Sequence, residues 1–226
     1  MAEPSLLMHG ATASQLLPPL AVLASRGGRA KAHVWVAGGC LASLLGDLAQ
    51  LRLASQGANN LWVSYLSTPL VGVCFLVALS EFQPSLVGRL ALRLSAPGYV
   101  FAWYALTAFF EDTTTFSRYA YPLHALLLLG ASAFTLVARG LQPSPRGTLR
   151  SGWFWVATGL GLHSATTAAM EPLLVFFMPD RVDLVIAAYQ VRAGSYVLSF
   201  LAIAWGVYCP KRTTVSGLSS SPQPSA

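Results

Sequence analysis

Residues 61–80 read LWVSYLSTPLVGVCFLVALS, a stretch without a charged side chain. About 20 apolar residues in a helix are enough to cross the hydrocarbon core of a bilayer. Six further apolar segments occur along the chain, separated by short polar connections. The seven segments lie at residues 11–26, 32–54, 60–81, 90–111, 119–139, 152–178 and 184–208. The sequence therefore predicts an all-α, polytopic transmembrane bundle of seven helices.

The composition excludes an ordinary soluble domain. Only 10% of the residues are charged and 54% are hydrophobic, whereas soluble domains have about 25% charged residues. The net charge of +6 does not indicate nucleic-acid binding, because the basic residues lie in short clusters between apolar segments. The partner that this composition predicts is the lipid bilayer.

Three segments are irregular. In the first, Pro18 and Pro19 interrupt a short apolar run, and a proline inside a helix kinks it. This segment is therefore a tilted span, a re-entrant segment or an interfacial helix, and the bundle has six helices if it does not cross. In the fourth, residues 85–95 form an amphipathic stretch that we expect Pro97 to break. In the third, Pro69 should bend the helix and expose a carbonyl near Tyr65.

Basic residues alternate between connections. Three basic residues lie in the connections on one predicted side, and the same connections contain four acidic residues. Ten lie on the other side: Arg26, Arg29, Lys31, Arg89, Arg93, Arg139, Arg146, Arg150, Lys211 and Arg212. The positive-inside rule places the richer side in the cytoplasm. We therefore expect an extracytoplasmic N-terminal segment at residues 1–10, a bundle at residues 11–209 and a disordered cytoplasmic tail at residues 210–226.

A few ionisable residues fall inside the predicted spans, where they are costly and often functional. At 1.5 Å per residue, four of them lie about 8 to 12 Å below the outer boundary: Asp47, His124, Glu171 and Arg192. Glu171 and Arg192 belong to consecutive segments with a short connection, so we expect antiparallel neighbours and an ion pair between them. Pro172 should free a carbonyl beside this pair.

Two interpretations of this layer remain open. In one, Glu171, Arg192 and Asp47 form a structural network that fixes helix register. In the other, the outer half of the bundle holds a polar pocket for a small ligand, a lipid or a partner, with Gln50 and Gln190 also at its mouth. The candidate ligand-binding residues are Asp47, Asn60, Tyr65, Tyr104, His124, Glu171, Tyr189 and Arg192.

Several chemistries find no support in the residue pattern. A retinal protein needs a lysine in its last helix, and the two lysines lie at the predicted cytoplasmic face. Haem ligation, zinc-binding, phosphate-binding and nucleophile motifs are not evident. We therefore predict no catalytic residue, metal or cofactor. Two alternatives stay open: a lipid-modifying enzyme using Asp47, Glu171 and His124, and a small secondary transporter, although no internal repeat is visible.

One region resembles a known group. The runs GDLAQL at 46–51, GANNLWVSY at 57–65 and TPL at 68–70 resemble a group of bacterial multi-span proteins without an established activity. In that group an acidic residue closes the second helix and an Asn-x-Trp pattern opens the third. The resemblance implies a multi-span topology in a bacterial inner membrane. Gly46-Asp47 also resembles the lysoplasmalogenase-like membrane hydrolases, but their Lys-Pro and His-x-x-Tyr elements are not in the expected places.

Overall fold

The computed structural model describes residues 6–25, 30–115, 117–142, 147–177 and 182–209, with the side chains of 171–177, 182, 183 and 185 outside the described set. The described residues form α-helices and one short 3-10 turn. The helices are α1 (Leu6–Ser14), α2 (Leu17–Ala24), α3 (Lys31–Ser55), α4 (Leu61–Glu81), α5 (Leu86–Phe110), α6 (Ala120–Gly140), α7 (Gly152–Phe177) and α8 (Val182–Tyr208), with the turn at Thr148–Arg150. The prediction of an all-α bundle is confirmed.

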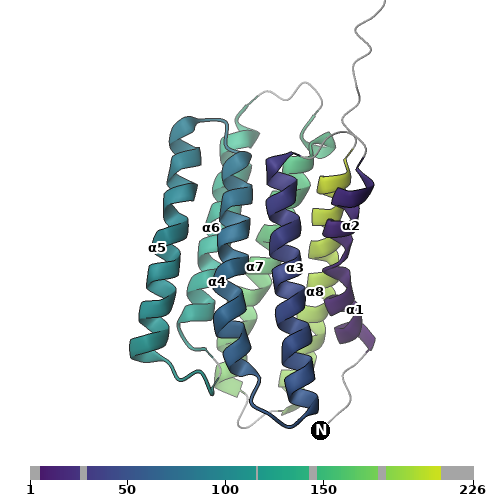
Figure 1. Cartoon of the computed structure of the whole chain (residues 1–226). Coiled ribbons are helices and arrows are strands. Elements are labelled where there is room, and N and C mark those ends of the chain that lie inside the picture. Colours follow the sequence, from purple (N-terminus) through teal and green to yellow (C-terminus); the bar gives the residue numbers. More distant parts are fainter. Residues whose placement is uncertain (1–5, 26–29, 116, 143–146, 178–181, 210–226) are drawn as a thin grey trace, which may run out of the picture.

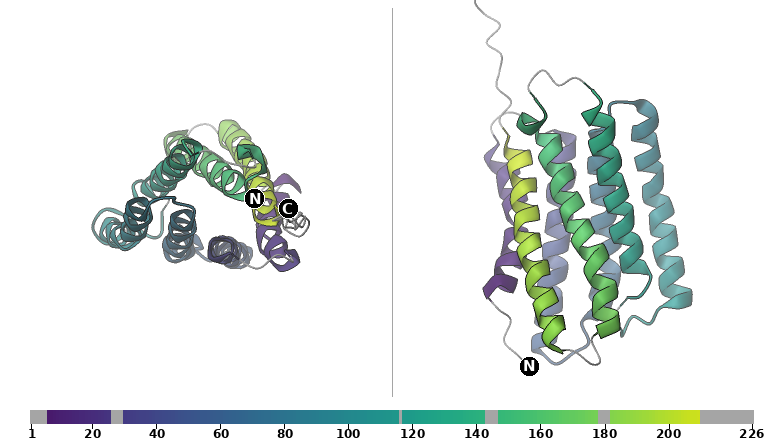
Figure 2. Two further views of the ribbon diagram at one scale, coloured as in Figure 1. Left: turned by 90° about the horizontal axis from the view of Figure 1, so that it is seen from above. Right: turned by 180° about the vertical axis from the view of Figure 1, so that it is seen from behind.

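The long helices form two rows that run alongside each other (Figures 1 and 2). The first row contains α3, α4 and α5, and the second contains α6, α7 and α8. The rows join at one side where α4 and α5 contact α6, and at the other where α1 and α2 pack on α8 and α2 also packs on α3. Consecutive helices α7 and α8 make the most extensive contact, which confirms that they are neighbours.

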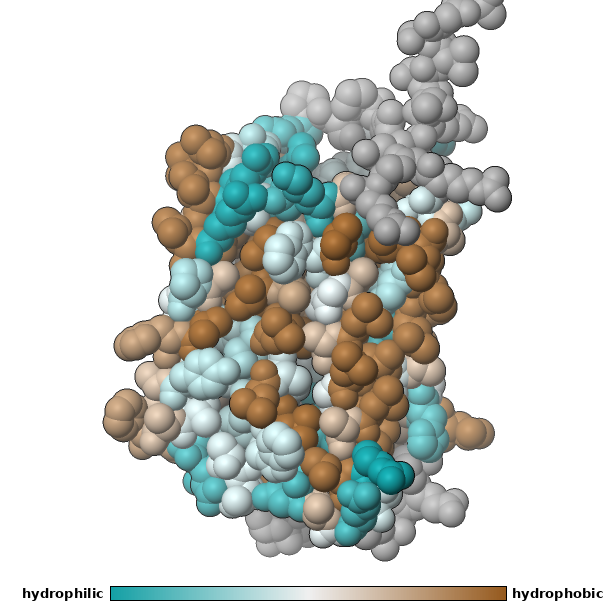
Figure 3. Space-filling model, viewed as in Figure 1, coloured by the Kyte–Doolittle hydropathy of each residue, from teal (hydrophilic) through white to brown (hydrophobic). Residues whose placement is uncertain are grey.

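The outer surface of the bundle is apolar. Phe109 is 80% exposed and Val87 78% exposed, and Figure 3 shows hydrophobic side chains over the middle of one face with hydrophilic ones near both ends. Within the part of the chain that the structure describes, five helical stretches are long and apolar enough to cross a membrane: residues 6–24, 31–55, 61–81, 120–140 and 186–208. Exposed apolar surface on this scale is unusual for a soluble monomer, so the chain is a membrane protein.

The first predicted segment is a broken helix. It begins at Leu6, earlier than the expected residue 11, and divides at Gln15 and Leu16 into α1 and α2. Pro18 and Pro19 lie in the first turn of α2, where a backbone without an N–H group loses no helical hydrogen bond. Together α1 and α2 are long enough to span a membrane. The expected tail at 210–226 lies outside the described residues.

The expected break at Pro97 is wrong. Helix α5 continues without interruption from Leu86 to Phe110 with Pro97 inside it. The buried residues Leu92, Ala96, Tyr99 and Trp103 hold both sides of the proline against the rest of the bundle. Such packing allows a transmembrane helix to tolerate the missing hydrogen bond.

The interior is packed most tightly between α7 and α8. A methyl group built on Gly159 would lie 2.7 Å from the carbonyl oxygen of Ser199 and equally close to Ile203. On the first row, Gly39 lies against the ring of Phe75. Small residues permit such approach in membrane bundles. Gly130, in contrast, has no neighbour within 4 Å of such a methyl group.

Candidate functional site

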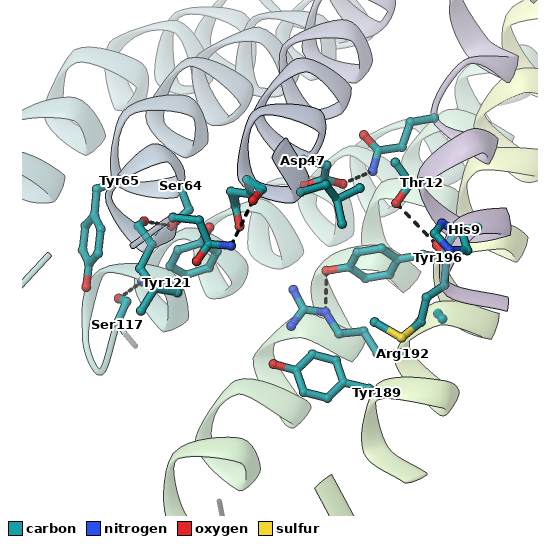
Figure 4. A pocket seen from close by; sticks show the side chains of 18 of the residues that line it. His9, Thr12, Asp47, Ser64, Tyr65, Ser117, Tyr121, Tyr189, Arg192 and Tyr196 are labelled. Carbon is teal, nitrogen blue, oxygen red and sulfur yellow. Dashed lines mark hydrogen bonds between the residues drawn. The ribbon is translucent and has the colours of Figure 1, made fainter. Parts of the chain in front are cut away.

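A cavity of about 310 Å³ opens between the two rows at the end of the bundle that holds the connections 56–60 and 111–119, here called the cavity end. Ligand sites in proteins begin at about this size. Three walls contribute polar side chains (Figure 4). Among the described residues these are His9, Thr12, Gln15, Asp47, Gln50, Asn60, Ser64, Tyr65, Thr115, Ser117, Tyr121, Tyr189, Arg192 and Tyr196.

The first wall contains a hydrogen-bonded acid–amide pair. The amide Nε2 of Gln15, at the break between α1 and α2, donates to Oδ2 of Asp47 on α3 over 2.5 Å. Gln15 is only 2% exposed, and its Oε1 is buried without a hydrogen-bond partner among the described residues. An unsatisfied buried acceptor costs about 1–3 kcal/mol. The Oε1 of Gln15 is therefore an acceptor at the edge of the cavity that no described residue satisfies.

The second wall is built on α8. The Nε of Arg192 donates to the hydroxyl of Tyr196 over 2.9 Å, and the guanidinium lies 5.1 Å from the centre of that ring. The Tyr196 hydroxyl is also 2.9 Å from Oγ1 of Thr167 on α7. His163 on α7 stacks on the same tyrosine, with 4.2 Å between ring centres. These contacts fix the rotamer of Tyr196 and so orient Arg192 toward the space between the rows (Figure 4).

The third wall is held by Glu111, which directly follows α5 and whose carboxylate lies at the start of α6. Its Oε1 accepts hydrogen bonds from the hydroxyl of Ser117 and from the backbone N–H groups of Tyr119 and Ala120. A carboxylate is favoured at a helix N-terminus, where N–H groups lack helical partners. The Ser117 hydroxyl in turn accepts from the N–H of Tyr121. This arrangement places Ser117 and Tyr121 on the cavity surface.

The connection between α3 and α4 closes the same end. The side chain of Asn60 donates to the carbonyl of Gln50 on α3 over 3.2 Å, while Asn59 accepts from the N–H of Leu61. Asn59 therefore caps the start of α4 through its side chain, and Asn60 ties α4 to α3. Both Asn60 and Gln50 line the cavity.

The structure brings together five of the eight predicted ligand-binding residues: Asp47, Asn60, Tyr65, Tyr189 and Arg192. Gln50 joins them, whereas Gln190 is exposed outside the lining. The side chain of Glu171 lies outside the described residues, and with it the expected Glu171–Arg192 ion pair and the carbonyl freed by Pro172.

Two predicted residues lie elsewhere. His124 is buried between α6 and α5, where its Nδ1 is 2.8 Å from the Tyr99 hydroxyl and its ring packs against Trp103. Tyr104 lines an apolar groove beside Pro97 on α5. Both residues lie near the cavity end of their helices, as their positions along the chain predict. Their side chains point from a different face of the helix and do not line the cavity.

Sequence reasoning missed the contribution of α1. Gln15 and Thr12 lie one turn apart and face the cavity, with His9 at its exposed edge. A glutamine and a threonine three residues apart in an otherwise apolar segment predict a shared polar face, so this signal was present. Ser117 and Thr115 come from a connection and carry no comparable periodic signal.

Within the described residues, no group of three histidine, cysteine, aspartate or glutamate side chains could hold a metal ion. Among the described lining residues, Asp47 is the one carboxylate and Arg192 the one guanidinium. They lie on α3 and α8, on opposite rows, and both line the cavity. No protein-family model, curated protein or solved structure matches this chain.

Proposed function

We propose that this chain is a seven-span protein of a bacterial inner membrane, with its N-terminus outside and its C-terminus in the cytoplasm. Helices α5 and α7, of 25 and 26 residues, run alongside the five apolar stretches and match them in length. Lys31 begins α3, Arg93 lies in the first half of α5, Arg139 lies in the last turn of α6 and Arg150 ends the 3-10 turn before α7, and these ends of the elements lie opposite the cavity (Figure 1). The positive-inside rule favours the cytoplasm for that basic end, and the cavity then opens to the outer side.

We further propose that the cavity binds a small polar ligand. The observation that carries this proposal is the acid–amide pair of Asp47 and Gln15, in which Oε1 of Gln15 is buried beside the polar cavity without a hydrogen-bond partner among the described residues. Polar groups inside a membrane protein are costly unless they are paired or functional. A ligand that donates a hydrogen bond to Gln15 would satisfy the remaining acceptor.

Binding is better supported than catalysis. The enzyme alternative uses Asp47, Glu171 and His124 as acid or base, and of these His124 is hydrogen-bonded to Tyr99 outside the cavity lining. A candidate base must reach the substrate directly or through one water molecule. No specific observation favours the transport alternative.

Native mass spectrometry of the protein released from its own membrane tests the binding proposal. Thr12→Trp would fill the cavity, because Thr12 lines it, whereas Leu20→Trp adds the same ring on an exposed position of α2. We expect a bound small molecule on the wild type and on Leu20→Trp, and its loss from Thr12→Trp. Identical spectra for the three proteins would contradict the proposal.

A further inference from the structure

We infer that α4 and α5 bind an anionic phospholipid, with its phosphate at Arg89 and one acyl chain in the apolar groove beside Pro97. This inference goes beyond the proposed cavity ligand, because the described linings of the cavity and of the groove have no residue in common. Three observations carry it: an arginine without an acceptor, a long apolar groove, and the position of both along one face of α5.

Arg89 lies in the first turn of α5, and its Nε is buried without a hydrogen-bond partner among the described residues. The acid of this region, Glu81, already forms an ion pair with Arg93. Gln83 does not supply an acceptor, since its Nε2 donates to Thr135 and its Oε1 makes no hydrogen bond with Arg89. An unpaired guanidinium in a membrane-spanning helix is costly, and a bound anion would provide the missing acceptor.

The apolar groove lies between α4 and α5 and has a volume of about 760 Å³. Its described lining is apolar apart from the hydroxyl of Tyr104, and it consists of Val73 on α4 and of residues on α5 from Ala96 to Phe109. At 1.5 Å per residue this part of α5 is about 20 Å long, which exceeds half of the roughly 30 Å hydrocarbon core. The groove therefore has the length and the polarity that suit one extended acyl chain.

The arginine and the groove lie along one face of α5. Arg89, Arg93, Pro97, Val100 and Tyr104 follow one another at spacings of three and four residues, which places them on the same side of the helix. About 20 residues of helix cross the hydrocarbon core, and counting back from Phe110 at the far end of α5 puts Arg89 at the opposite edge of the core. Figure 3 shows hydrophilic side chains gathered over the upper ends of α4 and α5. An amphiphile with its headgroup at the membrane edge and its chain in the core matches this order.

A phosphate suits the polar end of this site. A guanidinium binds phosphate oxygens through several N–H donors, and basic pockets between transmembrane helices bind anionic headgroups. Pro97 has no N–H group to donate to the carbonyl of Arg93, four residues earlier. A headgroup hydroxyl would satisfy that carbonyl, which favours phosphatidylglycerol over a fatty acid.

Native mass spectrometry of the full chain released from nanodiscs tests this inference. The nanodiscs contain equal amounts of phosphatidylglycerol and of phosphatidylcholine, which has no net charge and no headgroup hydroxyl. We expect about fivefold greater retention of phosphatidylglycerol, since phosphatidylcholine loses one hydrogen bond of ordinary strength. Equal retention of the two lipids would overturn the assignment of an anionic headgroup. Displacement of phosphatidylglycerol by an equal amount of oleate would overturn it in favour of a fatty acid.

Variants test the two parts of the site separately. Arg89→Gln removes the charge, and Arg150→Gln is its control, because Arg150 is exposed at the same end of the bundle in the turn before α7. Ala105→Trp fills the groove, and Ala133→Trp adds the same ring at an exposed position of α6 outside the groove lining. We expect Arg89→Gln to lower the retention of phosphatidylglycerol about tenfold, through loss of a charge-assisted hydrogen bond. Ala105→Trp should lower it to a similar extent, and both controls should retain the lipid as the wild type does.

Ala105 is half-buried, so its substitution can disturb folding. Ala108→Trp, at an exposed position of the same groove, provides a second filling variant, and thermal unfolding in detergent shows which variants are folded. Retention of phosphatidylglycerol by both Arg89→Gln and a folded filling variant would overturn the site. Loss from Arg89→Gln but not from a folded filling variant would show that the groove does not hold the chain. Equal loss from Arg150→Gln would show a general attraction to the basic end, and either result contradicts the inference.

Discussion

The indole Nε1 of Trp103 donates a hydrogen bond to the carbonyl oxygen of Tyr65 over 3.0 Å. That carbonyl lies four residues before Pro69, whose ring nitrogen carries no hydrogen to donate in the helical pattern. Helix α5 therefore supplies to α4 the donor that α4 cannot provide for itself. Both residues are buried, Trp103 completely, so water does not replace the bond.

Replacing Trp103 by Phe should destabilise the protein by about 1–3 kcal/mol, because a buried carbonyl loses its donor, with a further loss from the smaller ring. Trp155→Phe is the matched control, since the Trp155 indole donates to Leu149 at an exposed position. Thermal unfolding in detergent measures both changes. A similar loss of stability in the two variants would contradict the role of the Trp103 bond.

Pro69→Ala restores a backbone N–H one turn after Tyr65. In the Trp103→Phe background we expect this second change to recover part of the lost stability, because the carbonyl regains a helical partner. In the wild-type background it should give no comparable gain. A double-mutant cycle measured by the same unfolding transition checks the coupling, and purely additive effects would show that the carbonyl does not link the two residues.

Exchanging the acid and the amide of the Gln15–Asp47 pair should restore the stability that the first of the two substitutions removes. Gln15→Glu places a second carboxylate 2.5 Å from the first and should destabilise the junction of α1 and α2 by about 1–3 kcal/mol near neutral pH. Adding Asp47→Asn restores one acid and one amide at the same positions, and stability should return toward the wild-type value. Limited proteolysis near the break at Gln15, together with thermal unfolding, reports the result. A double variant no more stable than Gln15→Glu alone would exclude direct pairing.

The close contact of α7 with α8 predicts that replacing glycine by alanine destabilises the protein at Gly159 but not at Gly130. Gly159→Ala forces a methyl group against the backbone of Ser199 and should cost about 1–3 kcal/mol through overpacking. Gly130→Ala is the matched control because the space around Gly130 is open, and there the change should be neutral or slightly stabilising. Equal unfolding temperatures for the two variants would contradict the close approach of the helices.

Glu111 should stabilise both α6 and the third wall of the cavity. Glu111→Ala removes the acceptor of three hydrogen bonds and should cost about 1–2 kcal/mol, as loss of a helix cap does. Asp112→Ala is the control, because the exposed Asp112 accepts one backbone bond, from Thr114. Hydrogen exchange of the first turn of α6 measures the local effect. Protection unchanged in Glu111→Ala would refute the capping role.

The sequence predicted the parts of the fold that depend on composition and covalent geometry. Apolar length located all seven segments, and a proline in α4 indicated a free carbonyl near Tyr65, which the Trp103 bond confirms. The adjacency of α7 and α8 followed from their short connection. The continuity of α5 through Pro97 did not follow, because tertiary packing of its buried face outweighs the local loss of one hydrogen bond.

The candidate site was only partly predictable. Depth along each helix can be counted in residues, and it correctly grouped Asp47 with Arg192. Direction around the helix axis depends on which neighbours a helix packs against, and so His124 and Tyr104 were assigned to a cavity that they do not line. To predict Gln15 as a partner of Asp47, one would need to know that α1 lies beside α3. No local sequence pattern specifies that contact.

The proposed orientation can be tested with single cysteines in a background where Cys40, Cys74 and Cys209 are replaced by alanine. Leu6 and Ala58 lie toward the cavity end and Leu149 toward the basic end, and all three are exposed. In intact spheroplasts, a membrane-impermeant maleimide should label cysteines at positions 6 and 58, and position 149 only after permeabilisation. Labelling at 58 but not at 6 would show that the broken helix of α1 and α2 does not cross. Labelling at 149 alone would invert the orientation and place the cavity on the cytoplasmic side.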